Sequence, residues 1–425
     1  MNFHTPKAAG IHRQKSHIEK EIRDLPQPGA HAQRQSERLI ELIRERIELA
    51  GGQIPFADYM SLALYAPGLG YYSAGNQKFG RGGDFVTAPE ISPLFSRCVA
   101  RQCQPVLAEL KASDITVPII LEVGGGSGVM AADILAELER LDCLPAEYQI
   151  LELSAELQQR QAQTIAAKVP HLVGRVTWLT ALPAQPFNGI VLANELLDAM
   201  PVHRFCLPEN SGTAPREAFV RWQEDRLAWL FDVPSSERLQ ERIAAIANLL
   251  GSNYLGRERP QEFVSEINLA AEAWVKTIAD CLNAGLILII DYGFPRHEYY
   301  HPQRNTGTLM CHYRHRNHMD PFVYPGLQDI TAHVDFTAIA EAAADSGLNV
   351  AGYNTQGFFL LAAGLNEMMA EVDPNNTVEY LRLSQQVKTL TLPGEMGELF
   401  KVLALTRNVE APLLGFALQD LRNRL

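Results

Sequence analysis

The chain has 425 residues, 47% of them apolar, and a formal net charge of −12. This length can bury one large or two modest cores. The negative charge argues against general nucleic-acid binding, and no apolar run is long enough to span a bilayer. Six scattered cysteines form no C-x-x-C pair, which indicates reduced core residues rather than disulfides or zinc ligands. We therefore expect a cytoplasmic protein without membrane insertion.

The first 35 residues are polar and lack an apolar signal region, so they predict a mobile tail. A mitochondrial transit peptide is the weaker interpretation. Three acids, Glu19, Glu21 and Asp24, interrupt the basic character that such a peptide needs.

Residues 36–116 predict an N-terminal helical segment. Apolar residues recur at helical spacing in 36–49. A glycine-rich loop follows at 79–92 and leads into a helix near Pro93. We expect this loop to cover a cofactor and exclude water. It carries three candidate cofactor-binding residues, Asp84, Thr87 and Glu90. For Glu90, an acid placed at a helix start is an equally good interpretation.

Residues 117–425 predict an α/β core. Apolar runs of strand length alternate with helical patterns, at residues 118–123, 148–153, 175–179, 189–193 and 286–291. This alternation is typical of a parallel, doubly wound sheet. Two insertions interrupt it. Residues 205–262 predict an antiparallel hairpin followed by a helix, and residues 294–330 are rich in His, Arg, Tyr and Pro.

The last third of the chain predicts further elements. Residues 335–344 form a helical pattern with Asp335 as a good N-cap, and residues 358–362 and 400–405 are strand candidates. Several histidines and arginines gather in 312–318. No carboxylate or cysteine spacing there supports a metal site.

A glycine-rich turn follows the first apolar run. Residues 119–128 read Ile-Ile-Leu-Glu-Val-Gly-Gly-Gly-Ser-Gly, and an amphipathic stretch follows. The pattern predicts a strand, a tight turn and a helix. Gly124, Gly126 and Gly128 allow the backbone to approach a ligand closely, and the helix start offers free N–H groups. We interpret the turn as a nucleotide-type cofactor loop.

Two acids indicate which cofactor the loop holds. Glu152 follows the second run and can accept two hydrogen bonds from a ribose diol, as in NAD and S-adenosyl-L-methionine (SAM) sites alike. The glycine spacing is G-x-G-x-G, not the G-x-G-x-x-G of dinucleotide sites. Glu122 suits the ammonium group of a methionine moiety better than a pyrophosphate. These residues favour SAM over NAD.

The residues from Asn194 to Asp198 are expected at the carboxyl end of the fourth strand, where α/β sheets bind ligands. Glu195 and Asp198 are the candidate catalytic acids, and Asn194 is a candidate cofactor contact. Asp198 could equally cap the turn before Pro201. Asp291, after the fifth run, could line the same cleft or belong to a turn.

Four motifs, in this order, resemble the MidA family of SAM-dependent methyltransferases: residues 59–72, 83–92 (Gly-Asp-Phe-Val-Thr-Ala-Pro-Glu-Ile-Ser), 194–205 (Asn-Glu-Leu-Leu-Asp-Ala-Met-Pro-Val-His-Arg-Phe) and 327–336. The resemblance runs from about residue 35 to the C-terminus. It implies a class I SAM-methyltransferase (Rossmann-like) fold and protein arginine N-methylation. The family's mitochondrial member is associated with an arginine of a respiratory complex I subunit.

Two departures from the family pattern stand out. Gly125 occupies a position where proline is common, which should loosen the loop. Residues 180–182 read Thr-Ala-Leu, where many methyltransferases place an acid for the adenine amino group. We expect backbone groups to hold adenine there instead.

The expected function is methylation of an arginine in a respiratory-complex subunit or another protein. Guanidinium is a poor nucleophile, and fixed carboxylates can orient it and localise its charge. The alternatives are a small-molecule methyltransferase and a non-catalytic assembly chaperone of a respiratory complex. A non-catalytic chaperone is expected to have lost the cofactor-binding and catalytic motif residues, but these residues are intact. The expected partners include a second copy of the chain, in a homodimer.

Overall fold

The computed structural model describes residues 25–74, 86–112, 117–209, 213–253, 262–373 and 375–425. The chain divides into two compact units. Unit 1 comprises Met1–Phe85, Pro201–Ile267 and Pro302–Ala332, and unit 2 comprises Val86–Met200, Asn268–His301 and His333–Leu425. Both units are therefore assembled from segments that lie far apart in the sequence.

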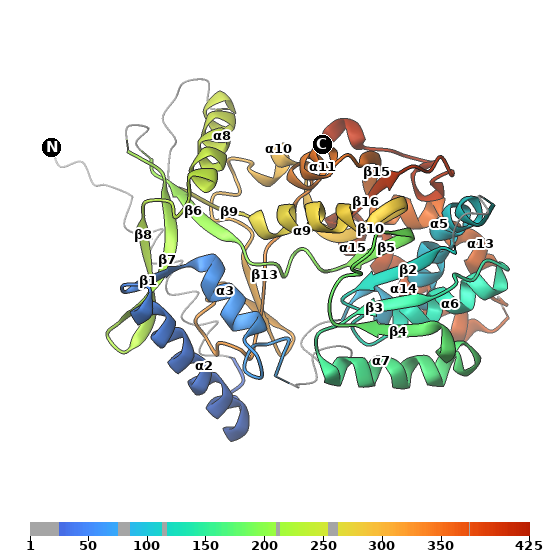
Figure 1. Cartoon of the computed structure of the whole chain (residues 1–425), viewed down its shortest axis with the longest axis horizontal. Coiled ribbons are helices and arrows are strands. Elements are labelled where there is room, and N and C mark those ends of the chain that lie inside the picture. The colour runs from blue at the N-terminus through green and yellow to red at the C-terminus, as the bar shows by residue number, and fades with distance from the viewer. Residues whose placement is uncertain (1–24, 75–85, 113–116, 210–212, 254–261, 374) are drawn as a thin grey trace. The chain divides into compact units, whose positions relative to one another are not determined.

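Unit 2 is built on an eight-stranded sheet whose main path runs in the order β15-β16-β10-β5-β2-β3-β4 (Figure 1). The eighth strand, β14, pairs with β10. The strands of the sheet are β2 (Ile119–Val123), β3 (Tyr148–Leu151), β4 (Val176–Leu179), β5 (Phe187–Asn194), β10 (Leu282–Phe294), β14 (Val334–Asp335), β15 (Asn349–Thr355) and β16 (Phe400–Arg407). The five predicted core strands are confirmed. The sheet is mixed rather than parallel, because β16 pairs antiparallel with both β10 and β15.

Helices bury both faces of this sheet, as a doubly wound fold requires. Alternate strand residues enter separate cores: Leu286 and Leu288 pack with helices α5 and α6, whereas Ile287 and Ile289 pack with α9 and α11. The helices of unit 2 are α4 (Ala88–Ile91), α5 (Pro93–Ala112), α6 (Val129–Arg140), α7 (Ala155–Lys168), α9 (Leu269–Asp280), α10 (Arg296–Tyr299), α11 (Phe336–Asp345), α12 (Gln356–Ala362), α13 (Leu365–Ala370), α14 (Thr377–Thr391) and α15 (Met396–Leu399).

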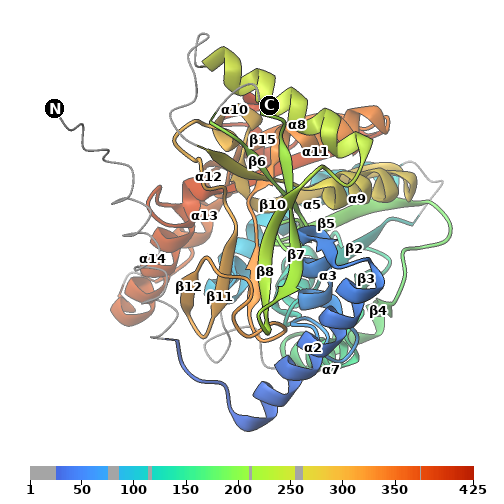
Figure 2. The ribbon, with the colours of Figure 1, turned by 90° about the vertical axis from the view of Figure 1, so that its left-hand side faces the viewer.

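Within its described residues, unit 1 combines two small antiparallel sheets with three helices, and Figure 2 labels most of these elements. The first sheet contains β1 (Gln53–Pro55), β6 (His203–Leu207), β7 (Arg216–Gln223), β8 (Arg226–Asp232) and β9 (Phe263–Ile267), and the second contains β11 (Met310–Tyr313), β12 (Arg316–His318) and β13 (Asp329–Thr331). The helices are α2 (Ala30–Leu49), α3 (Phe56–Tyr65) and α8 (Glu237–Asn253). The predicted hairpin is confirmed as β7 and β8, and α8 follows it.

The two stretches interpreted as insertions contribute most of their described residues to unit 1. α4 and α5 belong to unit 2 although they precede residue 117. The domain boundaries expected from the sequence stay a prediction.

One late strand prediction is wrong, and two other late predictions are confirmed. Residues 358–362 belong to helix α12, because a short apolar run cannot by itself distinguish a strand from a buried helix turn. The strand at 400–405 is confirmed as part of β16. Asp335 caps α11, since its side chain accepts a hydrogen bond from Ala338 N at 3.2 Å.

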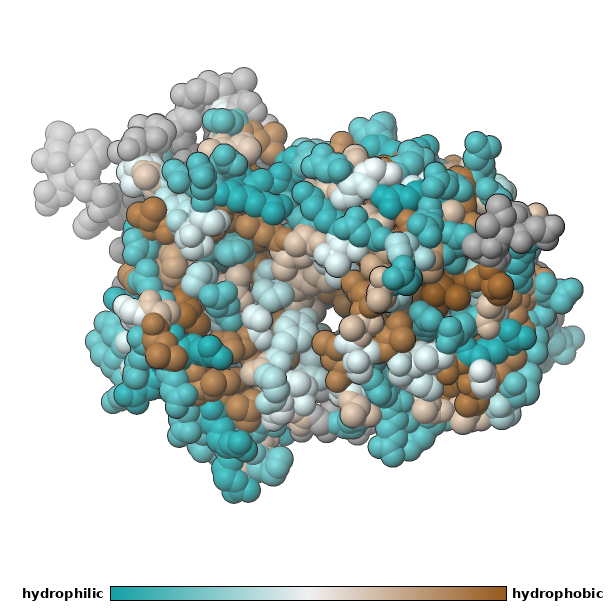
Figure 3. Space-filling model, viewed as in Figure 1, coloured by the Kyte–Doolittle hydropathy of each residue, from teal (hydrophilic) through white to brown (hydrophobic). Residues whose placement is uncertain are grey.

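The surface is mainly polar on the face drawn in Figure 3, where apolar residues emerge in smaller groups. Among the helices that the structure describes, none is long and apolar enough to cross a membrane.

Candidate functional site

The glycine turn joins β2 to α6 in unit 2. Gly124, Gly126 and Gly128 have φ angles of 76°, 51° and 82°, in the left-handed region that favours glycine. A Cβ atom at Gly126 would meet no atom within 4 Å, whereas one at Gly128 would lie 2.8 Å from Gln161 Cα. The turn is therefore packed on one side by α7 and open at Gly126.

Gly125 lies in the closely packed part of the turn. A Cβ atom there would lie 2.8 Å from Ile150 Cγ2 and 3.3 Å from Gln161 Nε2. The Gln161 side chain also donates a hydrogen bond to Gly126 O at 3.1 Å. The looser loop expected from Gly125 stays a prediction. The Gln161 side chain holds the loop from the side of α7, a contact that the sequence did not predict.

The two acids expected around the cofactor end neighbouring parallel strands. Glu122 lies on β2, opposite Ile150 of β3. Its side chain is only 2% exposed and accepts a hydrogen bond from the Tyr148 hydroxyl at 2.9 Å. Burial raises the pKa of Glu122 to about 7, against the lowering effect of the Tyr148 hydrogen bond.

Glu152 follows β3 and is partly exposed. One of its carboxylate oxygens accepts from Ser154 N at 2.9 Å and the other from Gln161 Nε2 at 3.1 Å. The next residue, Leu153, has 77% of its surface exposed. An ordered carboxylate is therefore followed in the chain by an exposed apolar side chain.

The predicted covering loop is described only from Val86 onward, and Asp84 lies outside the described residues. Thr87 precedes α4 as its N-cap residue, without a side-chain capping bond. Glu90 on α4 accepts a hydrogen bond from the Ser127 hydroxyl of the glycine turn. Ala88 N donates to a Glu195 carboxylate oxygen at 3.3 Å. The start of α4 thus contacts both the glycine turn and the acid-bearing turn after β5.

The turn after β5 carries Glu195 in a left-handed conformation, with φ 50°. A positive φ is uncommon for a residue other than glycine and is a frequent feature of functional sites. Glu195 N donates to Ile290 O at 2.9 Å, and the Glu195 carboxylate accepts from Asn194 Nδ2 at 3.3 Å. The carboxyl ends of β5 and β10 therefore fix Glu195.

Asp198 and Asp291 form a buried pair behind this turn. Asp198 is 5% exposed, and burial raises its pKa to about 6 although Tyr292 donates a hydrogen bond to it. Asp291 is fully buried and accepts from Leu197 N at 2.9 Å and Asp198 N at 3.3 Å. Burial and the nearby Asp198 and Glu195 raise the pKa of Asp291. Asp291 lies within β10 and not in a turn. Its buried carboxylate holds the backbone of the turn after β5.

Two buried oxygens at this turn lack a hydrogen-bond partner among the described residues, Asn194 Oδ1 and Asp198 Oδ1. Buried acceptors are normally satisfied. Two acceptors of this kind, in the same short turn as Glu195, suit a ligand that brings several N–H donors.

Gln161 and Leu153 were not predicted from the sequence. Gln161 occupies the buried stripe of α7 between Leu157 and Ile165. A polar residue on the apolar face of an amphipathic helix is a signal that could have identified it.

In the described part of the chain, no group of three or more His, Cys, Asp or Glu side chains could hold a metal ion. His312 lies in the β11–β12 hairpin, where its Nδ1 pairs with Asn317 Oδ1 at 3.0 Å. The six cysteines are buried and form no disulfide.

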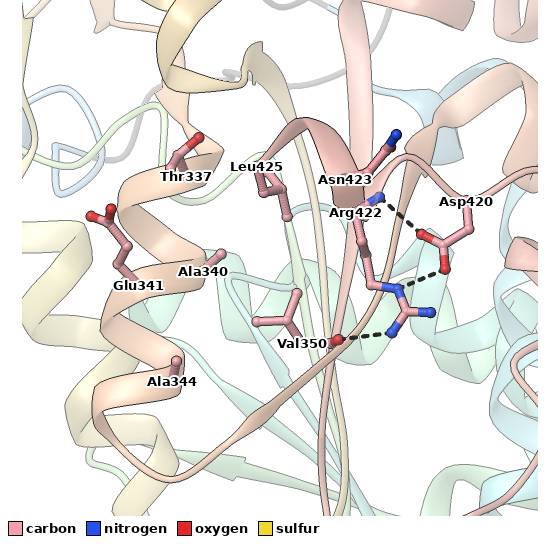
Figure 4. Close-up of a pocket in the computed structure, with 9 residues that line it drawn as sticks. All are labelled: Thr337, Ala340, Glu341, Ala344, Val350, Asp420, Arg422, Asn423 and Leu425. Atoms are coloured by element: carbon pink, nitrogen blue, oxygen red, sulfur yellow. Dashed lines mark hydrogen bonds and ion pairs between the residues drawn. The ribbon is translucent and has the colours of Figure 1, made fainter. Parts of the chain in front are cut away.

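A groove of about 770 Å³ lies elsewhere in unit 2, between α11 and the C-terminal residues (Figure 4). Its one guanidinium, that of Arg422, is held by Asp420 Oδ2 at 2.7 Å and Val350 O at 3.1 Å. The groove contains none of the predicted site residues.

Comparison with known proteins gives these features a context. Residues 98–354 match the Methyltransf_28 family of S-adenosyl-L-methionine-dependent methyltransferases. The chain is 31% identical to the mitochondrial protein arginine methyltransferase NDUFAF7 homolog of Drosophila melanogaster, over 93% of this chain and 92% of that protein. It is 29% identical to NDUFAF7 of Danio rerio, over 83% of each chain.

A solved structure covers nearly the whole chain. A crystal structure from Burkholderia thailandensis with bound S-adenosyl-homocysteine is 45% identical, with a TM-score of 0.86 over 95% of this chain and 100% of that chain. The expected fold and resemblance are confirmed: this chain belongs to the MidA-type family of SAM-dependent methyltransferases, in which its relatives include NDUFAF7.

Proposed function

We propose that this SAM-dependent methyltransferase methylates an arginine side chain of a protein. The relatives in Drosophila melanogaster and Danio rerio are named protein arginine methyltransferases. The observation that carries the proposal is the acceptor-rich turn after β5. Asn194 Nδ2 donates there to the Glu195 carboxylate, and Asp198 Oδ1, three residues further along the chain, has no partner among the described residues. A guanidinium group brings five N–H donors in a planar fork.

The residues around the glycine turn fit SAM. The open face at Gly126 leaves room for a ligand close to the backbone. We assign the backbone of Gly124, Gly126 and Gly128 to the methionine moiety, Glu122 to its ammonium group and Glu152 to the ribose diol. Thr87, Glu90 and Asn194 complete the proposed cofactor contacts, and Leu153 offers an apolar surface for adenine.

The turn after β5 would orient the arginine and shift the positive charge of its guanidinium. When bound, SAM supplies an electrophilic methyl group on a sulfonium ion. Glu195 would hold the guanidinium by a charge-assisted hydrogen bond and draw its positive charge away from the attacking nitrogen. That nitrogen loses one proton as it gains the methyl group, and the Glu195 carboxylate would accept this proton. Asp198 would accept a second N–H through its unpartnered oxygen. Its raised pKa means that it gains its charge near pH 6.

The acceptor protein that we propose is a respiratory-complex subunit or another protein, by analogy with the family. The cytoplasm is the proposed place of action, although the curated relatives are named as mitochondrial. We also propose that the chain forms a homodimer.

The deciding experiment uses labelled SAM with a host lysate, followed by mapping of the modified peptides. We expect label on arginine. With the identified acceptor, Glu195→Gln should lower single-turnover transfer by at least about a hundredfold. The amide keeps an oxygen that can accept from Ala88 N, so affinity for S-adenosyl-homocysteine (SAH) should stay within about twofold.

Glu156→Gln is the matched control, because Glu156 is an exposed acid on α7. It should methylate as the wild type does. Label confined to lysine or to small molecules would contradict arginine as the acceptor. A Glu195→Gln variant with the wild-type rate would remove Glu195 from the mechanism.

A further inference from the structure

We propose that Gln161 on α7 is a positioning residue for the cofactor. It would order the ribose-binding carboxylate and the glycine turn together, before the cofactor arrives. The inference rests on the proposed assignment of Glu152 to the ribose, and it goes beyond the motifs themselves.

Gln161 is fully buried, and the structure gives each of its polar atoms a partner. Its Nε2 donates to Glu152 Oε2 and to Gly126 O, both at 3.1 Å. Its Oε1 accepts from the Trp178 indole Nε1 at 2.8 Å. One side chain therefore links the residues after β3, the turn after β2 and the end region of β4.

Trp178 fixes which way the amide of Gln161 faces. An indole N–H can only donate, so Gln161 must present its oxygen to Trp178. A flipped amide would bring that oxygen against the Glu152 carboxylate and Gly126 O, two acceptors. Desolvation makes such contacts costly in a buried site. The NH₂ group is consequently held toward Glu152 and the glycine turn.

The bond to Glu152 restricts the ribose acid. One carboxylate oxygen is held by Gln161 and the other by Ser154 N at 2.9 Å. A carboxylate fixed at both oxygens loses little rotational freedom when the diol binds, and such preorganisation raises affinity.

The bond to Gly126 O orients the glycine turn. A trans peptide is planar, so its C=O and the following N–H point in opposite directions. When the Gly126 carbonyl points to Gln161, the Ser127 N–H points away from α7. A Cβ atom at Gly128 would lie 2.8 Å from Gln161 Cα, so a side chain there would force α7 or the turn to shift.

The test compares SAH with its 2′,3′-dideoxy analogue, which lacks the ribose hydroxyls, by calorimetry. Gln161→Met keeps the length of the side chain and removes its hydrogen bonds. We expect it to weaken SAH binding about tenfold and to weaken the analogue less. A residue that only supports the fold would weaken both ligands equally. In a Glu152→Ala background, Gln161→Met should lower the SAH affinity by a smaller factor than it does in the wild type.

Gln163→Met is the control, because Gln163 is exposed on the same helix, and it should bind SAH as the wild type does. If Gln161→Met fails to fold, Trp178→Phe replaces it. This variant leaves Gln161 in place but frees its amide to flip, so the SAH-to-analogue affinity ratio should fall.

Two results would overturn the inference. Wild-type SAH affinity in Gln161→Met, with a clear loss in Glu152→Ala, would remove Gln161 but leave the cofactor site intact. Equal losses for both ligands would make Gln161 a structural residue. Wild-type SAH affinity in Glu152→Ala would instead refute the placement of the ribose, on which the proposed function depends.

Discussion

Gly126 shows at the scale of one residue how an open backbone position differs from a crowded one. Its φ of 51° is strained for other residues, yet a Cβ atom there meets nothing within 4 Å. We predict that Gly126→Val folds and loses SAH binding, because the branched side chain occupies the space assigned to the methionine moiety. Calorimetry on the purified variant measures this loss.

Gly51 supplies the matched control for backbone strain. It has φ 86° and equally open surroundings, but it lies in unit 1 beyond the end of α2. Gly51→Val should lower stability to a similar extent and leave SAH affinity unchanged. A folded Gly126→Val variant with wild-type affinity would place the cofactor elsewhere.

Glu122 predicts a pH effect on stability. Burial raises its pKa from 4.5 to about 7 in the folded chain, so between these values the folded state holds a proton that the unfolded state has released. The free energy of unfolding therefore falls as the pH rises through this window. Glu122→Gln removes this dependence. It should be more stable than the wild type at pH 8, by on the order of 3 kcal/mol, and similar at pH 4.5.

Urea unfolding at the two pH values measures the difference. The same variant should bind SAH more weakly, because an amide cannot neutralise the ammonium group. An equal stability difference at pH 4.5 and pH 8 would mean that Glu122 does not titrate as its burial implies.

At the scale of elements, the strand pair β5 and β10 depends on two glycines that face each other in register, Gly189 and Gly285. A Cβ atom at Gly189 would overlap with Ile119 O of β2, and one at Gly285 would overlap with Gly189 O. Glycine in a strand marks such a close backbone approach. We predict that Gly189→Ala and Gly285→Ala each cost at least about 3 kcal/mol of unfolding free energy.

Chemical denaturation checks both variants against Gly174→Ala. Gly174 lies before β4, where an added Cβ meets nothing within 4 Å. That control should be nearly neutral. Small losses in all three variants would show that the sheet can widen at these positions.

At the scale of the whole molecule, those proposed cofactor contacts that the structure describes lie in unit 2. Hydrogen exchange with and without SAH should therefore show new protection at the ends of β2, β3 and β5 and at the starts of α6 and α7. Amides of β7, β8, β11 and β12 in unit 1 should exchange at unchanged rates. A comparable gain of protection in those strands would contradict a cofactor site built from unit 2.

Much of this fold was accessible from the sequence because its signals are local. The strand, turn and helix at 119–140 follow from an apolar run, three glycines and a helical period. The positions of Glu122, Glu152 and Glu195 follow from strand ends, since parallel strands present their carboxyl ends at one edge of a sheet.

Local patterns were therefore enough to predict the α/β core and the acids at or near the strand ends, and the motifs were enough to predict the family. Three features could be seen only in the folded chain: the antiparallel placement of β15 and β16, the burial of Asp291 behind a turn 94 residues away, and the three partners of Gln161. These features depend on contacts between segments that are distant in the chain. No local period encodes such contacts, because packing and hydrogen-bond satisfaction select them only once the sheet has formed.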